Sequence, residues 1–150
     1  MSPRDDLTSL TATAARRGLD TNEFSATELT EAYLDRIGRL DDDLGSYLHV
    51  MADVARTQAA AADRRIAVGD AAPFTGIPVA LKDVLCTVDA PTTAASRILE
   101  GFRPPFDATV VRRLREQGAV FLGKANTDEF AMGSSNENSA FKPVRNPWDR

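Results

Sequence analysis

Apolar side chains recur at helical spacing in the first third of the chain. Ser25 and Glu28 stand three positions apart, in the capping-box pattern that begins many helices. Beyond them the apolar residues form one stripe at steps of three or four positions: Leu29, Tyr33, Ile37, Leu40 and Leu44. The pattern predicts an amphipathic helix over residues 25–44, and its stripe needs a partner surface.

The segments on either side of this helix predict two more helices and a strand. Residues 4–17 have a helical pattern, with Gly18 as the stop. Residues 46–51 predict a short strand. The alanine-rich residues 52–68 precede Gly69 and predict a helix whose small side chains allow close packing on a sheet.

The second half of the chain has the pattern of strand, helix and strand. Compact apolar runs at residues 77–81 and 119–122 predict the two strands. Between them, Asp107 is a suitable N-cap for a helix over residues 108–117, and Gly118 a suitable residue just past its end. This order favours a parallel pair of strands in an α/β fold. No internal repeat or linker divides the chain.

Composition and charge exclude several classes of function. The 150 residues are 43% apolar and 27% charged, which is typical of one globular domain. A formal net charge of −4 argues against a general electrostatic grip on nucleic acid, and Arg112, Arg113 and Arg115 fit a solvated helix face. One cysteine and one histidine leave no disulfide and no zinc spacing, so we expect no metal. Without a long apolar run or a secretory signal, we expect a cytoplasmic protein and no membrane contact.

Lys82 is the first candidate for chemistry because it ends an apolar strand. A lysine acts as a base at neutral pH only if its pKa falls by about three units, which costs ~4 kcal/mol. The apolar lead-in could supply this by burial, and Asp83 would oppose it only if the two groups met. Neighbours on a strand point to opposite faces, so we expect them to stay apart. The alternative is an ordinary lysine at a strand end.

A second lysine, Lys124, completes a G-x-x-x-x-G-K pattern that begins at Gly118. A nucleotide-binding loop would carry Ser or Thr at the next position, where this chain has Ala125. The four residues between the glycines form an apolar strand pattern, whereas a phosphate loop needs exposed amides. We therefore interpret this lysine as part of the strand region.

The segment GSSNEN at residues 133–138 offers hydroxyls and amides suited to a polar ligand. Ser134 or Ser135 could act as a nucleophile, but the same composition also predicts an ordinary turn. His49 lies in a predicted strand far along the chain from these motifs, so a histidine-based triad has no support. Cys86 has no motif that couples it to a base, and we expect an idle thiol.

Several blocks of the sequence together resemble the amidase signature family. They are GIPVALKD (76–83), TTAAS (92–96), PFDATVVRRL (105–114), GAVFLGKAN (118–126) and DEFAMGSSNENSAF (128–141), followed by RNPWD. The last block is similar in particular to the A subunits of glutamyl-tRNA(Gln)/aspartyl-tRNA(Asn) amidotransferases. The resemblance implies a mixed sheet covered by helices. Residues 1–150 would form the N-terminal part of one amidase domain, helical to about residue 70 and α/β from about residue 71.

The resemblance also implies a mechanism and a set of site residues. In the family a serine attacks the side-chain amide of glutamine, a second serine in a cis peptide relays the proton, and a lysine accepts it. Lys82 matches that lysine, and Met132, Gly133, Ser134 and Ser135 match a segment that lines the amide pocket. Both catalytic serines of the family lie beyond RNPWD, so we expect residues 1–150 to be inactive alone.

Partners follow from the same resemblance. The released ammonia would pass to the B subunit of a complex that also has a C subunit. There, ATP and Mg²⁺ serve the conversion of glutamyl-tRNA(Gln), or aspartyl-tRNA(Asn), to its amide. This chain would hold no cofactor and would contact tRNA mainly through the partner. Ala125, Thr127 and Lys142 depart from residues common in such chains, which affects substrate selection. Two alternatives are a general amidase for small amides and a non-catalytic module that docks through the helix at residues 25–44.

Overall fold

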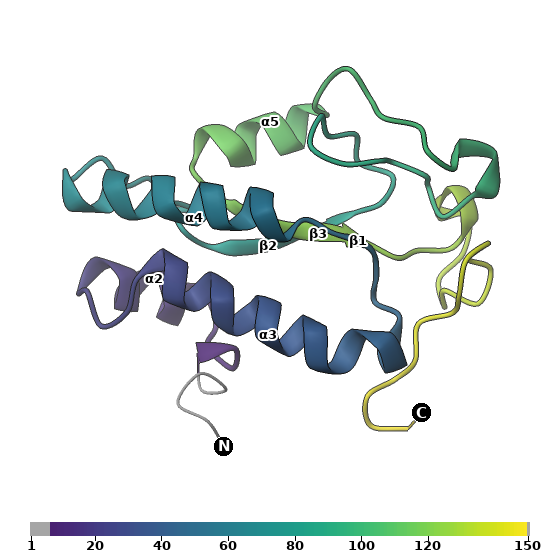
Figure 1. Cartoon of the computed structure of the whole chain (residues 1–150), viewed down its shortest axis with the longest axis horizontal. Coiled ribbons are helices and arrows are strands. Elements are labelled where there is room, and N and C mark those ends of the chain that lie inside the picture. Colours follow the sequence, from purple (N-terminus) through teal and green to yellow (C-terminus); the bar gives the residue numbers. More distant parts are fainter. Residues whose placement is uncertain (1–6, 150) are drawn as a thin grey trace.

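A three-stranded mixed sheet lies at the centre of the fold (Figure 1). The computed structural model describes residues 7–149. The strands are β1 (Tyr47–Val50), β2 (Pro78–Lys82) and β3 (Val120–Ala125), and β3 lies between the other two. β2 runs parallel to β3, as the sequence predicts, and β1 runs antiparallel to it. The predicted mixed α/β class is confirmed.

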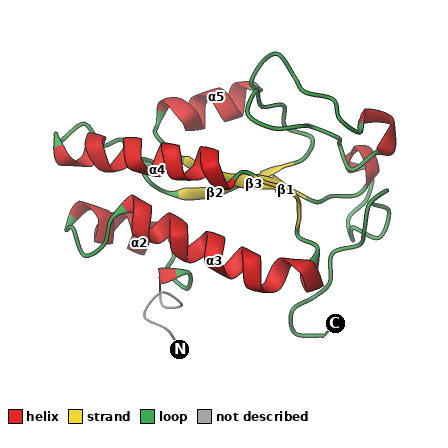
Figure 2. Ribbon diagram, viewed as in Figure 1, coloured by secondary structure: helices red, strands yellow, loops and turns green. Residues whose placement is uncertain are grey.

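Helices cover both faces of this sheet (Figure 2). They are α2 (Ala12–Asp20), α3 (Ala26–Leu44), α4 (Ala52–Ala67) and α5 (Thr109–Glu116), with short 3₁₀ turns at Arg97–Leu99 and Glu129–Ala131. Among the helices of residues 7–149, none combines the length and the hydropathy of a membrane-spanning segment.

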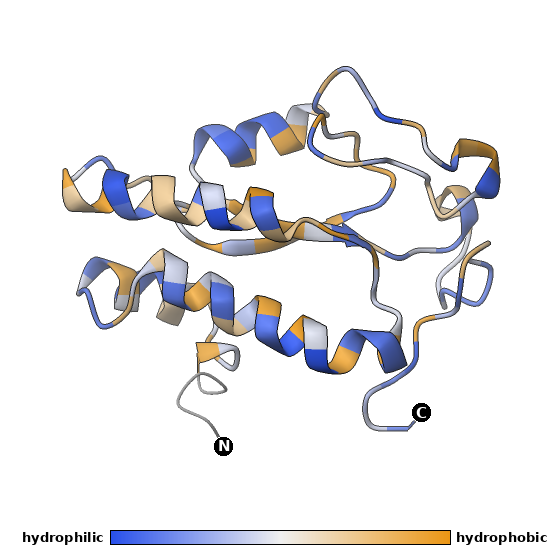
Figure 3. Ribbon diagram, viewed as in Figure 1, coloured by the Kyte–Doolittle hydropathy of each residue, from blue (hydrophilic) through white to orange (hydrophobic). Residues whose placement is uncertain are grey.

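Alternate residues of β3 enter two separate hydrophobic cores. Val120 and Leu122 pack with α2, α3 and α4, whereas Phe121 packs with Val111 of α5. All three β3 side chains are at most 3% exposed. Hydrophilic and hydrophobic residues alternate along α3 and α5, as expected for helices that pack on one side only (Figure 3). The alternation of β3 therefore fixes which helices cover which face.

The amphipathic helix α3 confirms the capping-box prediction. The Ser25 hydroxyl accepts from the amide of Glu28 at 3.0 Å, and the Glu28 carboxylate accepts from the amide of Ser25 at 2.8 Å. Leu29 of the predicted stripe is fully buried. The helix ends at Gly45, whose φ of 73° is left-handed.

The alanine-rich helix α4 is also confirmed. Ala55, Ala59 and Ala62 are buried in the core that contains Val120 and Leu122 of β3. Directly after Ala62, the Asp63 carboxylate accepts from the amides of Ala26 at 2.6 Å and Thr27 at 3.1 Å, which caps the beginning of α3. Small side chains and this cap hold α3 and α4 together.

The prediction for the first helix is confirmed over residues 12–17 but is wrong at residues 8–11 and at the stop. Residues 4–6 of the predicted helix lie outside the described part of the chain, and α2 begins only at Ala12. Gly18 lies inside α2 and is buried, because the Phe24 ring packs against it; a Cβ there would stand 2.4 Å from the ring. Packing against an aromatic ring, and not helix termination, explains this glycine.

The predicted N-cap of α5 is also wrong, since Ala108 holds that position without a side-chain bond. The Asp107 carboxylate instead accepts from the amide of Val88 at 3.0 Å and from Arg115 at 2.8 Å. Burial acts to raise the pKa of Asp107, but the hydrogen bonds from Arg115 and Val88 outweigh it and hold the pKa below its ordinary value. Asp107 thus ties α5 to the loop after β2.

The last strand runs past the predicted end at Leu122 to Ala125. Gly123 continues the strand because β1 approaches it closely: a Cβ at Gly123 would lie 2.4 Å from the backbone oxygen of His49. The glycine therefore permits strand pairing beyond the predicted end of the strand at Leu122.

Gly123→Ala should lower the free energy of unfolding by about 1–3 kcal/mol, because the new methyl group meets the backbone of β1. Gly38→Ala is the matched control, since a Cβ there meets nothing within 4 Å. This second change should stabilise the protein by about 0.5–1 kcal/mol through helix propensity. Urea unfolding followed by circular dichroism measures both, and equal effects of the two changes would refute the close approach.

Candidate active site

β2 carries Lys82 to the edge of the sheet, where it faces an open pocket of about 590 Å³. The pocket is lined by residues of three other segments: Asn126–Asp128, Gly133–Asn136 and Val144–Pro147. The Lys82 side chain is exposed. The apolar run before it suggested that the amine would be buried, and the described residues 7–149 do not bury it. Segments that are far apart in the sequence thus meet at one lysine.

Directly behind Lys82, a buried ion pair joins β2 to β3. The Lys124 ammonium lies 2.9 Å from a carboxylate oxygen of Asp83, and the two side chains are 0% and 1% exposed. The ammonium also donates to the hydroxyl of Thr92 at 2.6 Å and to the carbonyl of Pro91 at 3.2 Å. Asp83 therefore turns inward while Lys82 faces the pocket, as expected for neighbours at a strand end.

Burial lowers the pKa of Lys124, and the hydrogen bond and negative charge of Asp83 act in the opposite direction. A buried charge costs several kcal/mol of solvation, on the order of what a close partner returns. Each member of the pair thus makes the burial of the other tolerable. Lys124 is a buried strand residue, which agrees with the rejection of the nucleotide-loop pattern.

The second oxygen of Asp83 holds the loop that contains TTAAS. It accepts from the amide of Thr93 at 3.0 Å, from the Thr93 hydroxyl at 2.5 Å and from the amide of Ala95 at 3.4 Å. The carbonyl of Asp83 accepts from the amide of Ala94 at 3.1 Å. Ala94 and Ala95 have left-handed φ values of 50° and 52°, which a loop keeps only when such bonds enforce them.

This loop in turn holds the segment that lines the pocket. The carbonyl of Ala94 accepts from the amide of Phe130 at 2.8 Å, and the carbonyl of Ala95 accepts from the amide of Ala140 at 2.9 Å. The Ser96 hydroxyl donates to Glu129 at 2.6 Å. Hydrogen bonds therefore connect the buried ion pair to Glu129, Phe130 and Ala140, which flank the loop beside Lys82.

The predicted polar segment folds around Asp128. The Asp128 carboxylate accepts from the amide of Asn136 at 2.9 Å and from that of Asn138 at 3.0 Å. The bonds from Asn138 and Asn136 hold the pKa of Asp128 below its ordinary value. Gly133 leaves room for the carboxylate, since a Cβ there would stand 2.4 Å from its carbon.

The structure brings together most of the residues that the sequence singled out. Gly133, Ser134 and Ser135 line the same pocket as Lys82, whereas Met132 is 75% exposed and does not line it. The Ser135 hydroxyl donates to Glu137 at 2.7 Å. Ser134 and Ser135 are both exposed on a bent loop. The sequence predicted either a turn or a ligand-binding segment here, and this one loop is both a turn and a wall of the pocket.

Asn126 anchors the site, although no prediction from the sequence singled it out. Its side-chain amide donates to the carbonyls of Gly45 at 3.1 Å and Lys142 at 2.7 Å. Its oxygen accepts from the amide of Thr127 at 2.9 Å and from the Ser139 hydroxyl at 2.8 Å. The sequence did contain a signal for this role: an asparagine, whose side chain has two donor hydrogens and an acceptor oxygen, directly follows an apolar strand.

His49 and Cys86 do not line the pocket of Lys82. His49 is far from the motifs in sequence, but it pairs with Lys124 across the sheet and lines a separate hollow of about 190 Å³ with Asp83. Burial and the charges of Arg103 and Lys124 lower the pKa of His49. Cys86 is a half-buried free thiol. Within residues 7–149, no group of three or more His, Cys, Asp or Glu side chains could hold a metal ion.

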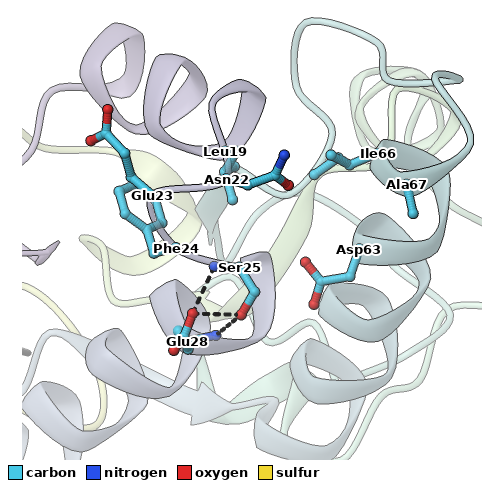
Figure 4. A pocket seen from close by; sticks show the side chains of 9 residues that line it. All are labelled: Leu19, Asn22, Glu23, Phe24, Ser25, Glu28, Asp63, Ile66 and Ala67. Atoms are coloured by element: carbon cyan, nitrogen blue, oxygen red, sulfur yellow. Dashed lines mark hydrogen bonds between the residues drawn. The ribbon is translucent and has the colours of Figure 1, made fainter.

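A further hollow of about 400 Å³ lies beside the beginning of α3 (Figure 4). Two of its three carboxylates serve α3, because Glu28 belongs to the capping box and Asp63 caps the amides of Ala26 and Thr27. The third, Glu23, accepts from the Thr21 hydroxyl. The remaining wall includes the apolar side chains of Leu19 and Ile66. These polar groups serve the helix terminus, so the pocket of Lys82 remains the candidate site.

Comparison with known proteins supports a single family. The sequence model described as Amidase matches residues 28–150. The chain is 55% identical over 145 residues to the A subunit of the glutamyl-tRNA(Gln) amidotransferase of Thermobifida fusca, an alignment that covers 96% of this chain and 29% of that protein. The chain therefore spans less than a third of the length of this relative.

Solved structures of amidases have the same fold. The peptide amidase of Stenotrophomonas maltophilia is 37% identical with a TM-score of 0.80, over 89% of this chain and 28% of that one. The A subunit of the glutamyl-tRNA(Gln) amidotransferase of Thermotoga maritima is 38% identical with a TM-score of 0.63, over 97% of this chain and 27% of that one.

Lys124→Met should lower the free energy of unfolding by about 3–5 kcal/mol, because it leaves the Asp83 carboxylate buried without its partner. The double change with Asp83→Asn should recover most of this loss, since neither charge is then buried. Arg112→Met is the control, because its ion pair with Glu116 is exposed and contributes less than about 1 kcal/mol. Urea unfolding measures each value, and a single change as mild as the control would disprove the buried pair.

Asp128→Asn should destabilise the protein at pH 7 and less so in acid. The folded carboxyl has a lowered pKa, so its stabilisation is complete above the unfolded value of about 3.9 and is lost as pH falls through the folded one. The urea midpoints of the two proteins should therefore converge below about pH 4. Ser134→Ala, an exposed change in the same loop, should leave the midpoint unchanged. A difference for Asp128→Asn that is constant from pH 7 to acid would contradict this.

Proposed function

The chain belongs to the amidase family, and from that premise we propose that it forms the N-terminal part of the A subunit of a glutamyl-tRNA(Gln) amidotransferase. Residues 1–150 would then be part of one amidase domain. The Thermobifida fusca relative is about three times as long as this chain. The activity of that domain would be the release of ammonia from glutamine in the cytoplasm.

The pocket shared by Lys82 and the loop at Gly133–Asn136 is the observation that carries this proposal. A lysine at the edge of a sheet can accept a proton from a hydroxyl group when further segments cover it and exclude water. The loop beside it offers hydroxyl and amide groups that can hydrogen-bond a polar amide. Sequence identity of 55% to the Thermobifida fusca amidotransferase chain favours glutamine as the amide.

In the proposed mechanism, a serine from outside residues 1–150 attacks the glutamine amide, and a second such serine relays the proton to Lys82. The tetrahedral oxyanion is stabilised by backbone amides, and an acyl-enzyme divides amide cleavage into two easier steps. Gly133, Ser134 and Ser135 hold the substrate side of the pocket, and the expected role of Met132 is not included because this residue does not line it. Without those serines the 150-residue chain does not hydrolyse glutamine.

The proposed partners are the B and C subunits of a heterotrimer. Ammonia passes to the B subunit, which binds ATP, Mg²⁺ and the glutamyl-tRNA(Gln) that is converted to glutaminyl-tRNA. The net charge of −4 is consistent with a protein that leaves most of the tRNA contact to its partner.

A general amidase is the second candidate. The peptide amidase of Stenotrophomonas maltophilia superposes with a TM-score of 0.80, against 0.63 for the Thermotoga maritima amidotransferase chain. Dependence of ammonia release on the B and C subunits separates the two functions, because a general amidase needs no partner.

Lys82→Ala should reduce ammonia release from glutamine by roughly 10²–10⁴-fold, the usual contribution of a general base. The assay uses a chimera in which residues 1–150 replace the matching segment of the Thermobifida fusca protein, purified with that protein's own B and C subunits. Arg112→Ala is the matched control, because Arg112 is exposed on α5 and does not line the pocket. It should retain ammonia release near the level of the unsubstituted chimera.

Two results would overturn the proposal. One is normal ammonia release by the Lys82→Ala chimera. The other is glutamine hydrolysis by the isolated 150-residue chain that Lys82→Ala abolishes, since the chain would then need no serine from elsewhere.

A further inference from the structure

The buried pair of Asp83 and Lys124 lies immediately next to Lys82 along the chain and across the sheet. Lys82 pairs with Ala125 and Leu81 with Lys124, so β2 and β3 end side by side. Just beyond the last paired residue, the amide of Asp83 donates to the carbonyl of Ala125 at 2.9 Å. The backbone on both sides of Lys82 is therefore fixed to β3.

The side chain of Asp83 is held at both of its carboxylate oxygens. One oxygen meets the Lys124 ammonium, and the other accepts three hydrogen bonds from Thr93 and Ala95. Since adjacent residues of an extended strand point to opposite sides, the inward lock on Asp83 leaves Lys82 only the outward direction. We propose that Asp83 and Lys124 are positioning residues, which aim the amine of Lys82 into the pocket and fix the loop opposite it.

The same carboxylate also determines where that loop lies. Ala94 and Ala95, held by Asp83, accept hydrogen bonds from Phe130 and Ala140, which flank the loop at residues 133–136. Lys82 and the loop that faces it therefore share one anchor. Movement of Asp83 would displace both sides of the pocket at once.

A stability role alone does not account for the pair. Well-packed apolar residues of the same volume stabilise a protein as well as, or better than, a buried ion pair. An ion pair with fixed donors and acceptors, in contrast, selects one geometry. Misplacement of a reacting group by about 1 Å can cost roughly 10²-fold in rate. Fixed geometry next to the base is therefore what the pair contributes.

This inference rests on the proposed role of Lys82, and the test distinguishes a failure of the positioning role from a failure of the proposed function. Asp83→Asn/Lys124→Met in the Thermobifida fusca chimera removes both charges together, so no unpaired charge remains to unfold the protein. We expect kcat for ammonia release to fall about 10- to 100-fold. The KM for glutamine and the melting temperature should stay near those of the unsubstituted chimera. Arg112→Met/Glu116→Gln, which neutralises an exposed pair on α5, should change neither kcat nor KM.

Thr92 offers a milder variant should the double change fail to fold. Its hydroxyl accepts from Lys124 at 2.6 Å, and Thr92→Val removes that contact while the shape is kept. Thr92→Val should lower kcat several-fold, and Thr92→Ser should restore it.

Each outcome decides the matter. Wild-type kcat in the folded double variant, or in Thr92→Val, assigns the pair a purely structural role and overturns the positioning proposal while Lys82→Ala is still inactive. Ammonia release that survives Lys82→Ala overturns the proposed function and the positioning together. A loss of kcat at unchanged KM in both variants supports the proposal.

Discussion

The ion pair between Asp83 and Lys124 is the constraint on which the rest of this structure depends. Two charges at 0–1% exposure are tolerated because each neutralises the other and because Thr92, Thr93 and Ala95 hydrogen-bond to them. Those hydrogen bonds order the loop after β2, and that loop orders the segment that ends in the pocket. Burial energy of the two cores holds the sheet together, but the pair decides what the sheet edge presents.

The mixed topology explains why this edge is a suitable place for chemistry. β3 lies between a parallel and an antiparallel neighbour, and its side chains are buried alternately in the two hydrophobic cores. At its end, Asn126 joins the carbonyls of Gly45 and Lys142, so the helix α3 and the polar loop meet the same point. Side chains such as Lys82 that emerge here are supported by rigid elements and face an open pocket.

Much of the fold could be predicted from the sequence, because its signals are local. The capping box at Ser25, the alanine face of α4 and the parallel strands each follow from short-range patterns. The errors arose where a contact outside the local helix or strand pattern decides: Phe24 explains Gly18, the approach of β1 explains Gly123, and Arg115 and Val88 redirect Asp107 from its expected cap.

The candidate site could be predicted only in part for the same reason. Lys82 and the loop at Gly133–Asn136 stand out by residue type, and family resemblance adds their roles. The pairing of Asp83 with Lys124 joins residues 41 positions apart and has no local signal beyond a charge within an apolar strand.

A crystal structure of the chimera with the Thermobifida fusca protein tests the central claim most directly. The account predicts the Lys82 amine within about 2.6–3.2 Å of a serine hydroxyl from outside residues 1–150; a Lys82 amine in solvent, with no serine in reach, would contradict it.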